Sequence, residues 1–225
     1  NIVVFDGCST VYDDCGQIIY EVSPYAEGTY DTIMKESAVS IPETVQDDTK
    51  ELYQAVRCGI KEFFAALPVG KRKIVIGLSG GIDSSLSAAL YADILGAQNV
   101  IGINMPSKFN SDKTKNLAAA LAENLGITYE VRPIQEIVDA IAASCGVKED
   151  SSAYENIQAR SRMEILAGRA QQLGCVFSAN WNKIEAAFGY GTLYGDMAGA
   201  LAILGDLVKR EIYQLAEYMN REIFK

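Results

Sequence analysis

The chain has 225 residues, of which 49% are hydrophobic and 22% are charged, with a net charge of −9 and no histidine. This length allows one full domain with additional chain, and the acidic balance argues against a protein that tracks nucleic-acid phosphates. The absence of histidine excludes Ser–His–Asp and Cys–His catalysis and any zinc site that needs imidazole. Chemistry is left to carboxylates, lysines, arginines, hydroxyls, backbone amides and a hard metal ion, an inventory that fits ATP with Mg²⁺ as cofactor.

No apolar run approaches the ~18 residues of a membrane span. Five scattered cysteines without C-x-x-C spacing favour a reduced, cytoplasmic protein. The sequence therefore predicts no membrane and no nucleic acid among the partners.

The first 28 residues carry the pattern of a β-hairpin. Apolar stretches at Ile2–Phe5 and Val11–Tyr12 precede an acidic, glycine-containing turn at Asp13–Gly16, and Ile18–Val22 follows. A lone hairpin is marginally stable in water, so we expect this piece to need a partner sheet. The pattern then fades over residues 29–50, which we interpret as a linker.

From residue 51 onward the pattern is that of an α/β domain. A core helix is expected first, with apolar residues at helical spacing from Leu52 to Leu67 and an end at Pro68. Buried strands and helices then alternate, which predicts a doubly wound parallel sheet with helices on both faces and ligands at the carboxyl ends of its strands. The expected strands are Ile74–Leu78, Val100–Met105, Ile127–Ile134 and Cys175–Ser178, and the expected helices are Ser84–Leu95, Asp112–Leu125 and Tyr154–Leu173.

A glycine loop between the first of these strands and its helix is the most informative motif. Its sequence runs Gly77-Leu78-Ser79-Gly80-Gly81-Ile82-Asp83-Ser84-Ser85. Adjacent glycines allow the backbone to approach a ligand, and the following helix N-terminus suits a pyrophosphate. Asp83 can hold a magnesium ion that bridges phosphates. The pattern is not a Walker loop, since no Lys-Ser/Thr follows, and the alternative is a tight turn in which Asp83 or Ser84 only caps the helix.

Polar residues recur further along the chain. Within Glu155–Arg162, Asn156 and Arg160 are four apart and share a helix face suited to a carboxylate or phosphate, whereas Arg162 points elsewhere. A solvated helix face is the alternative. Two further segments, Ser178–Glu185 and Gly189–Asp196, follow a buried strand, where such folds bind ligands; ordinary packing is the alternative for their aromatic residues.

The glycine loop resembles the pyrophosphate loop of N-type ATP pyrophosphatases, which cleave ATP between the α- and β-phosphates. The later segments, with Leu207-Val208-Lys209, look like the synthetase domain of NAD synthetases over residues 51–225, without the family's last C-terminal segments. That resemblance implies ATP-dependent amidation of deamido-NAD and, as in the family, a homo-oligomer. It implies ATP contacts at Gly77, Leu78, Ser79, Gly80, Gly81, Ile82, Asp83, Ser84, Asn180 and Lys209; deamido-NAD contacts at Asn156, Arg160, Glu185, Tyr190, Gly191, Thr192 and Leu193; and Mg²⁺ ligands at Asp83 and Glu185.

Three positions depart from the family pattern. Asn180 stands where Thr is common, Trp181 where Gly is usual, and Leu193 where ammonia-dependent members often carry Lys. The departures bear on the hydroxyl contact to ATP, the shape of the pocket and one charge contact to the dinucleotide.

The segment Val4–Ser9 with the hairpin after it resembles the last strands of a nitrilase-type glutaminase domain. The resemblance implies that glutamine supplies the ammonia through a domain upstream of Asn1, with no glutaminase catalytic residue in this chain. Two other functions remain open at this point: another N-type ATP pyrophosphatase such as GMP synthetase, or a non-catalytic module that senses ATP.

Overall fold

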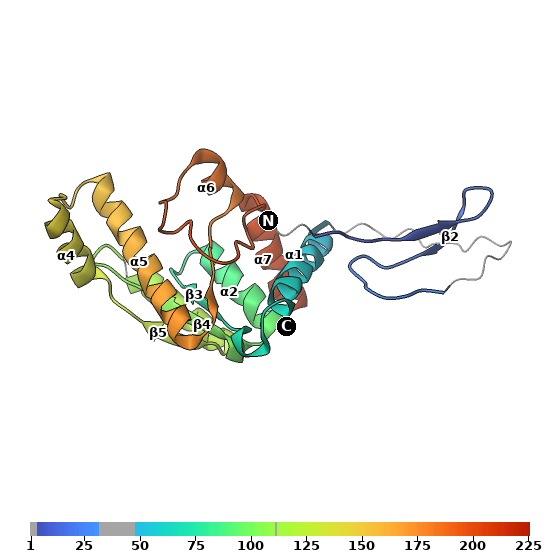
Figure 1. Cartoon of the computed structure of the whole chain (residues 1–225), viewed down its shortest axis with the longest axis horizontal. Coiled ribbons are helices and arrows are strands. Elements are labelled where there is room, and N and C mark those ends of the chain that lie inside the picture. Colours follow the sequence, from blue (N-terminus) through green and yellow to red (C-terminus); the bar gives the residue numbers. More distant parts are fainter. Residues whose placement is uncertain (1–3, 32–47, 111) are drawn as a thin grey trace. The chain divides into compact units, whose positions relative to one another are not determined.

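The computed structural model describes residues 4–31, 48–110 and 112–225 (Figure 1). Two compact units divide the chain, one from Asn1 to Gly59 and the other from Ile60 to Lys225. Helix α1 (Asp48–Ala65) crosses the boundary between them. Among the described residues, no helix combines the length and the apolar character required to cross a membrane.

The first unit contains the predicted hairpin. Strand β1 (Thr10–Tyr12) pairs antiparallel with β2 (Ile18–Glu21). In the turn between them, the Asp13 carboxylate accepts the backbone N–H groups of Cys15 (2.9 Å) and Gln17 (2.7 Å). The acidic residue thus satisfies the turn's donors, as the sequence pattern indicates. Most of the predicted linker, and the first part of the expected strand at Ile2–Phe5, lie outside the described residues; Val4 and Phe5 are not in a strand.

The second unit contains a parallel sheet with the order β5-β4-β3-β6. Its strands are β3 (Ile74–Gly77), β4 (Val100–Asn104), β5 (Thr128–Val131) and β6 (Val176–Phe177). The chain adds β4 and β5 on one side of β3 and then returns to the other side for β6. The strand order therefore reverses at β3, and ligands of doubly wound folds bind at such a reversal.

Helices cover both faces of this sheet, as predicted. On one face, α4 (Gln135–Cys145) and α5 (Ser152–Leu173) pack together and onto the sheet, with Val75, Ile103 and Leu166 in one buried cluster. On the other, α2 (Ile82–Leu95) and α3 (Asp112–Leu125) contact the strands, and α7 (Lys209–Glu222) contacts α2. Burial of these apolar residues on both faces holds the strand ends, and thus the loops that follow them, in fixed positions.

In the second unit, one strand and three helices depart from the sequence expectation. The expected strand Ile127–Ile134 is confirmed only over β5, because Pro133 has no N–H with which to continue the ladder. Helix α4, which begins directly after it, was not predicted. The short helix α6 (Lys183–Phe188) and helix α7 were not predicted either. The remaining elements are the 3-10 turns η1 (Val69–Lys71) and η2 (Ala97–Asn99).

Candidate active site

The glycine loop links β3 to α2 and is shaped by its own backbone and serines. Gly80 has φ +81°, a conformation that glycine adopts without steric cost. The hydroxyls of Ser84 and Ser85 donate to the Gly81 carbonyl at 3.1 and 2.8 Å, and the Ser79 and Ser84 hydroxyls are 3.1 Å apart. These bonds fix a loop that the sequence indicated only by its composition.

The N-terminus of α2 is left available to a ligand. Its N-cap is Gly81, and no side chain caps the helix. The alternative in which Asp83 or Ser84 serves only as a cap is therefore not what the structure shows. Backbone N–H groups of the first turn and the positive end of the helix dipole point to the mouth of the loop, an arrangement that favours an anion.

Amide side chains join the loop to the neighbouring strands. The Asn104 amide, at the end of β4, donates to the Leu78 carbonyl at 2.6 Å. The Asn180 amide, after β6, donates to the Gly77 carbonyl at 3.1 Å, and its own oxygen accepts the Ser178 hydroxyl at 2.9 Å. The carboxyl ends of three parallel strands are thereby held together around one pocket.

The pocket has a volume of about 430 Å³, within the range of roughly 300–1,000 Å³ for small-molecule sites. Of the residues predicted from the sequence, eight line it: Gly77, Leu78, Ser79, Asp83, Ser84, Asn180, Glu185 and Tyr190. The other predicted residues lie outside the lining: Gly80, Gly81, Ile82, Asn156, Arg160, Gly191, Thr192, Leu193 and Lys209.

The two predicted metal ligands are linked by one buried asparagine. Asn182 donates to the Asp83 carboxylate at 3.4 Å, and its backbone N–H donates to the Glu185 carboxylate at 3.0 Å. The Asn182 oxygen also accepts the N–H groups of Ile184 and Glu185, so that it caps α6. A single residue thus orients both carboxylates, one from α2 and one from α6.

Lys209 is connected to the pocket by its contact with Asp83. Its ammonium, at the start of α7, forms an ion pair with the Asp83 carboxylate. In the described ranges, a group of three potential metal ligands occurs in the hairpin turn, at Asp13, Asp14 and Cys15, not in the pocket. The pocket nevertheless fits Mg²⁺, because that ion is usually bound by one or two carboxylates together with substrate phosphates.

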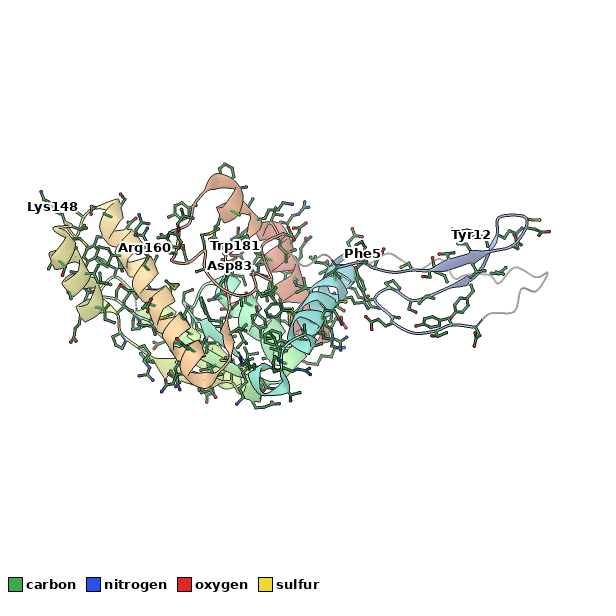
Figure 2. All side chains as sticks on the ribbon, viewed as in Figure 1. Phe5, Tyr12, Asp83, Lys148, Arg160 and Trp181 are labelled. Carbon is green, nitrogen blue, oxygen red and sulfur yellow. The ribbon has the colours of Figure 1, made fainter. Side chains whose placement is uncertain are left out.

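The predicted deamido-NAD residues hold each other in place. Asn156 on α5 accepts the Thr192 hydroxyl at 2.6 Å, and Arg160, one turn later, donates to the Leu193 carbonyl at 3.1 Å. Arg160 thus faces the loop that follows α6 (Figure 2). The shared helix face inferred from the i, i+4 spacing carries this loop, and the exposed side chain of Leu193 (70%) projects from it.

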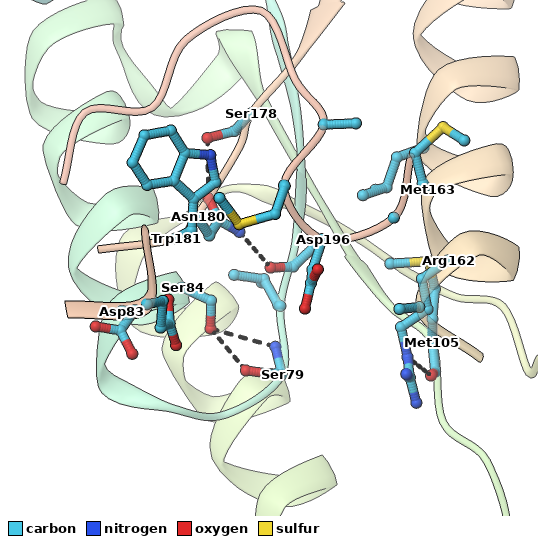
Figure 3. A pocket seen from close by; sticks show the side chains of 18 of the residues that line it. Ser79, Asp83, Ser84, Met105, Arg162, Met163, Ser178, Asn180, Trp181 and Asp196 are labelled. Carbon is cyan, nitrogen blue, oxygen red and sulfur yellow. Dashed lines mark hydrogen bonds between the residues drawn. The ribbon is translucent and has the colours of Figure 1, made fainter. Parts of the chain in front are cut away.

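Two of the pocket residues that were not predicted as ligand contacts, Arg162 and Trp181, have distinctive surroundings. Arg162 lies on the other face of α5 from Arg160. That face, which also carries Ala159, Met163 and Leu166, lines the pocket (Figure 3). The spacing i, i+3, i+4, i+7 of these four residues was the signal available in the sequence. Trp181 also lines the pocket, and its buried indole N–H has no partner among the described residues.

A doubly wound sheet with an open helix N-terminus and two linked carboxylates at its strand-order reversal defines a nucleotide-binding α/β domain. The chain belongs to the NAD synthase family, whose model matches residues 52–224.

Curated relatives match from two thirds of the chain to nearly all of it. A glutamine-dependent NAD(+) synthetase from Synechocystis is 37% identical over 98% of this chain and 41% of its own length. An NH(3)-dependent NAD(+) synthetase from Chlorobaculum tepidum is 40% identical over 67% of this chain and 54% of its own. The chain therefore spans about two fifths of the length of glutamine-dependent relatives such as the Synechocystis protein.

Solved structures agree with the fold. The glutamine-dependent NAD+ synthetase of Acinetobacter baumannii, in complex with ADP, superposes with a TM-score of 0.82 at 29% identity, covering 96% of this chain and 42% of that one. An NMN synthetase from Francisella tularensis superposes with a TM-score of 0.71 at 30% identity, covering 80% of this chain and 75% of that one.

Proposed function

We propose that this chain carries the synthetase site of a glutamine-dependent NAD synthetase, which amidates deamido-NAD to NAD at the expense of ATP. The observation that carries the proposal is the pocket at the α2 N-terminus, where an open phosphate cradle lies beside carboxylates linked by Asn182. The match of the NAD synthase family over residues 52–224 supports the same acceptor.

The reaction requires a carboxylate to be made reactive toward ammonia. A carboxylate oxygen of the nicotinate group attacks the α-phosphorus of ATP, the bond to the β-phosphate oxygen breaks, and pyrophosphate leaves. Ammonia then attacks the acyl carbon, one proton is lost, and AMP departs with the bridging oxygen to leave the amide. Each step joins or separates groups of high negative charge, so the site must stabilise charge at the phosphates.

The residues of this chain divide that task. The amides of Gly80 and Gly81 and the first turn of α2 hold the departing pyrophosphate. Asp83 and Glu185 would bind Mg²⁺, which when present neutralises phosphate charge. Lys209 is paired with Asp83 in this structure. We infer that its ammonium moves from Asp83 to a phosphate oxygen when ATP is bound.

Opposite these groups, the loop clamped by Asn156 and Arg160 would position the acceptor. Tyr190, whose side chain is 82% exposed at the pocket edge, is available to contact the dinucleotide. We infer that Thr192 and Leu193 act through the loop backbone, because their bonds to α5 fix it.

We further infer that ammonia comes from glutamine through a glutaminase domain encoded in the same polypeptide, and that the protein is a cytoplasmic homo-oligomer. The glutamine-dependent relatives and the resemblance of residues 1–28 to the end of a nitrilase-type domain support the first inference. In this assignment, residues 29–50 are the linker and 51–225 the synthetase domain. The complete reading frame, and size-exclusion chromatography of its product, test these points.

A second acceptor is favoured by a specific observation. The similar structure from Francisella tularensis, at 30% identity, is that of an NMN synthetase, an enzyme named for a mononucleotide product. Nicotinate mononucleotide is therefore the competing acceptor, ahead of xanthylate, the acceptor of a GMP synthetase.

Pyrophosphate release by the full-length protein tests the proposal. ATP, Mg²⁺ and ammonia or glutamine are supplied with deamido-NAD, nicotinate mononucleotide or xanthylate in parallel. Release with deamido-NAD and formation of NAD are expected. A preference for either other acceptor would reassign the substrate, and ATP binding without pyrophosphate release on any acceptor would indicate a sensing module.

A further inference from the structure

Arg162 is the basic residue of a pocket whose lining is otherwise acidic or neutral. Among the described residues that line it, the charged ones are Arg162, Asp83, Glu185 and Asp196. Both substrates proposed for this pocket are polyanions. Arg162, which the sequence analysis placed on a different helix face from Asn156 and Arg160, is therefore the cation that lines the pocket.

The guanidinium is anchored by one of its five N–H groups. Its Nε donates to the Met105 carbonyl, at the end of β4, at 3.3 Å. Figure 3 shows Arg162 and Met105 on one side of the pocket and Ser79 and Ser84 on the other. The remaining N–H groups form a planar fork, the geometry that matches phosphate oxygens.

Arg162 lowers the stability of the ligand-free protein. Burial lowers the pKa of its guanidinium, and the nearby charge of Asp196 acts in the opposite direction. Within the described ranges no carboxylate forms an ion pair with it. A partly buried cation without a paired anion is destabilising until an anion arrives.

Arg169, two turns further along the same helix, shows the contrasting arrangement. Its guanidinium pairs with the Glu130 carboxylate at 2.6 Å and also donates to Gln172 at 2.8 Å. The pKa of Glu130 is lowered chiefly by the hydrogen bond from Arg169. Arg169 is thus satisfied by the protein itself, whereas Arg162 is directed at the ligand pocket.

We propose that Arg162 binds a phosphate group of a substrate nucleotide, across the pocket from the glycine loop. The proposal rests on the function proposed above, since it requires a nucleotide in this pocket. It adds a second anion contact on the α5 side, distinct from the pyrophosphate seat at the α2 N-terminus. Either ATP or deamido-NAD can present that phosphate.

Calorimetric titration of the full-length protein with ATP·Mg²⁺ and, separately, with deamido-NAD tests this assignment. Arg162→Met should weaken at least one of these ligands by about 10-fold or more, because a charge-assisted hydrogen bond is lost. Arg162→Lys should recover part of the affinity, since the charge remains but the fork is lost. The ligand affected identifies the phosphate's source.

Thermal unfolding of the ligand-free proteins separates binding from structure. Arg162→Met should leave the melting temperature unchanged or raise it, whereas the control Arg169→Met should lower it and leave both affinities intact. Unchanged affinity of Arg162→Met for both ligands would overturn the proposal. So would a lowered melting temperature with a loss of affinity that Arg162→Lys does not relieve, because that result indicates a structural arginine.

The ligand titrations also keep this proposal separate from the proposed function. Wild-type protein that binds ATP but releases no pyrophosphate with any acceptor would refute the amidation reaction. The comparison of Arg162 variants in the binding of ATP and of deamido-NAD would still decide whether Arg162 contacts a phosphate.

Discussion

The pairing of Asp83 with Lys209 leads to a prediction in which stability and activity separate. Asp83→Asn keeps the shape and the acceptor for Asn182 but removes the charge that faces Lys209. In the ion pair, the Lys209 side chain is 45% exposed and that of Asp83 is 20% exposed. Pairs this accessible to solvent contribute about 0–1 kcal/mol, so the free energy of unfolding should fall by no more than about 1 kcal/mol.

Turnover should fall much further, because the same carboxylate would hold Mg²⁺ on the ATP phosphates. We expect kcat/KM for pyrophosphate release to drop at least about 100-fold, equivalent to about 2.7 kcal/mol of transition-state stabilisation. The assay is steady-state pyrophosphate release over a Mg²⁺ titration, with urea unfolding of both proteins as the control for folding. Near-normal kcat/KM of Asp83→Asn at saturating Mg²⁺ would remove Asp83 from the metal site.

Lys209→Met completes a double-mutant cycle with Asp83→Asn. If the two residues act on one phosphate–metal cluster, the double variant should lose less activity than the sum of the two single losses, in free-energy terms. Additive losses would mean that Lys209 and Asp83 serve separate steps.

Three further outcomes are expected. Arg160→Ala should weaken deamido-NAD binding by about 1–3 kcal/mol in isothermal titration and leave ATP affinity nearly unchanged. If Arg160 acts through the loop, Thr192→Val should reproduce part of that loss. If Arg160 contacts the dinucleotide directly, Thr192→Val should cause none of it. Gly199→Ala should destabilise the protein more than Gly189→Ala in urea unfolding, since a Cβ on Gly199 would lie 2.3 Å from the Ala179 backbone nitrogen whereas Gly189 has open space; equal losses would contradict the packing. The 225-residue chain should hydrolyse no glutamine, with or without deamido-NAD, in a glutamate-release assay; measurable hydrolysis would refute the assignment of that step to another domain.

The parallel sheet was predictable because buried strands between helices leave a local signature in the sequence. Helix α3 has the expected bounds, and the glycine loop lies between β3 and α2 as its composition indicates. Helix α4 was missed because Ile134, which forms an i, i+3, i+4, i+7 pattern with Ile137, Val138 and Ile141, was assigned to the end of one long strand.

The geometry of the candidate site was predictable where it depends on the local backbone. It was less predictable where it depends on which helix face meets a distant loop. The i, i+4 spacing correctly put Asn156 and Arg160 on one face of α5. It could not show that this face holds the loop after α6 while Arg162, on the other face, enters the pocket. That outcome depends on how α5 packs across β3 and β6, which is set by contacts far apart in the sequence.

The central claim is that the acceptor carboxylate is activated by adenylation, and isotope transfer measures this step directly. Deamido-NAD labelled with ¹⁸O in the nicotinate carboxylate is converted by the full-length protein with ATP, Mg²⁺ and ammonia, and the products are analysed by mass spectrometry. Attack of the carboxylate on the α-phosphorus requires one ¹⁸O in each AMP and none in pyrophosphate. Label in pyrophosphate or in inorganic phosphate, with unlabelled AMP, would contradict the account.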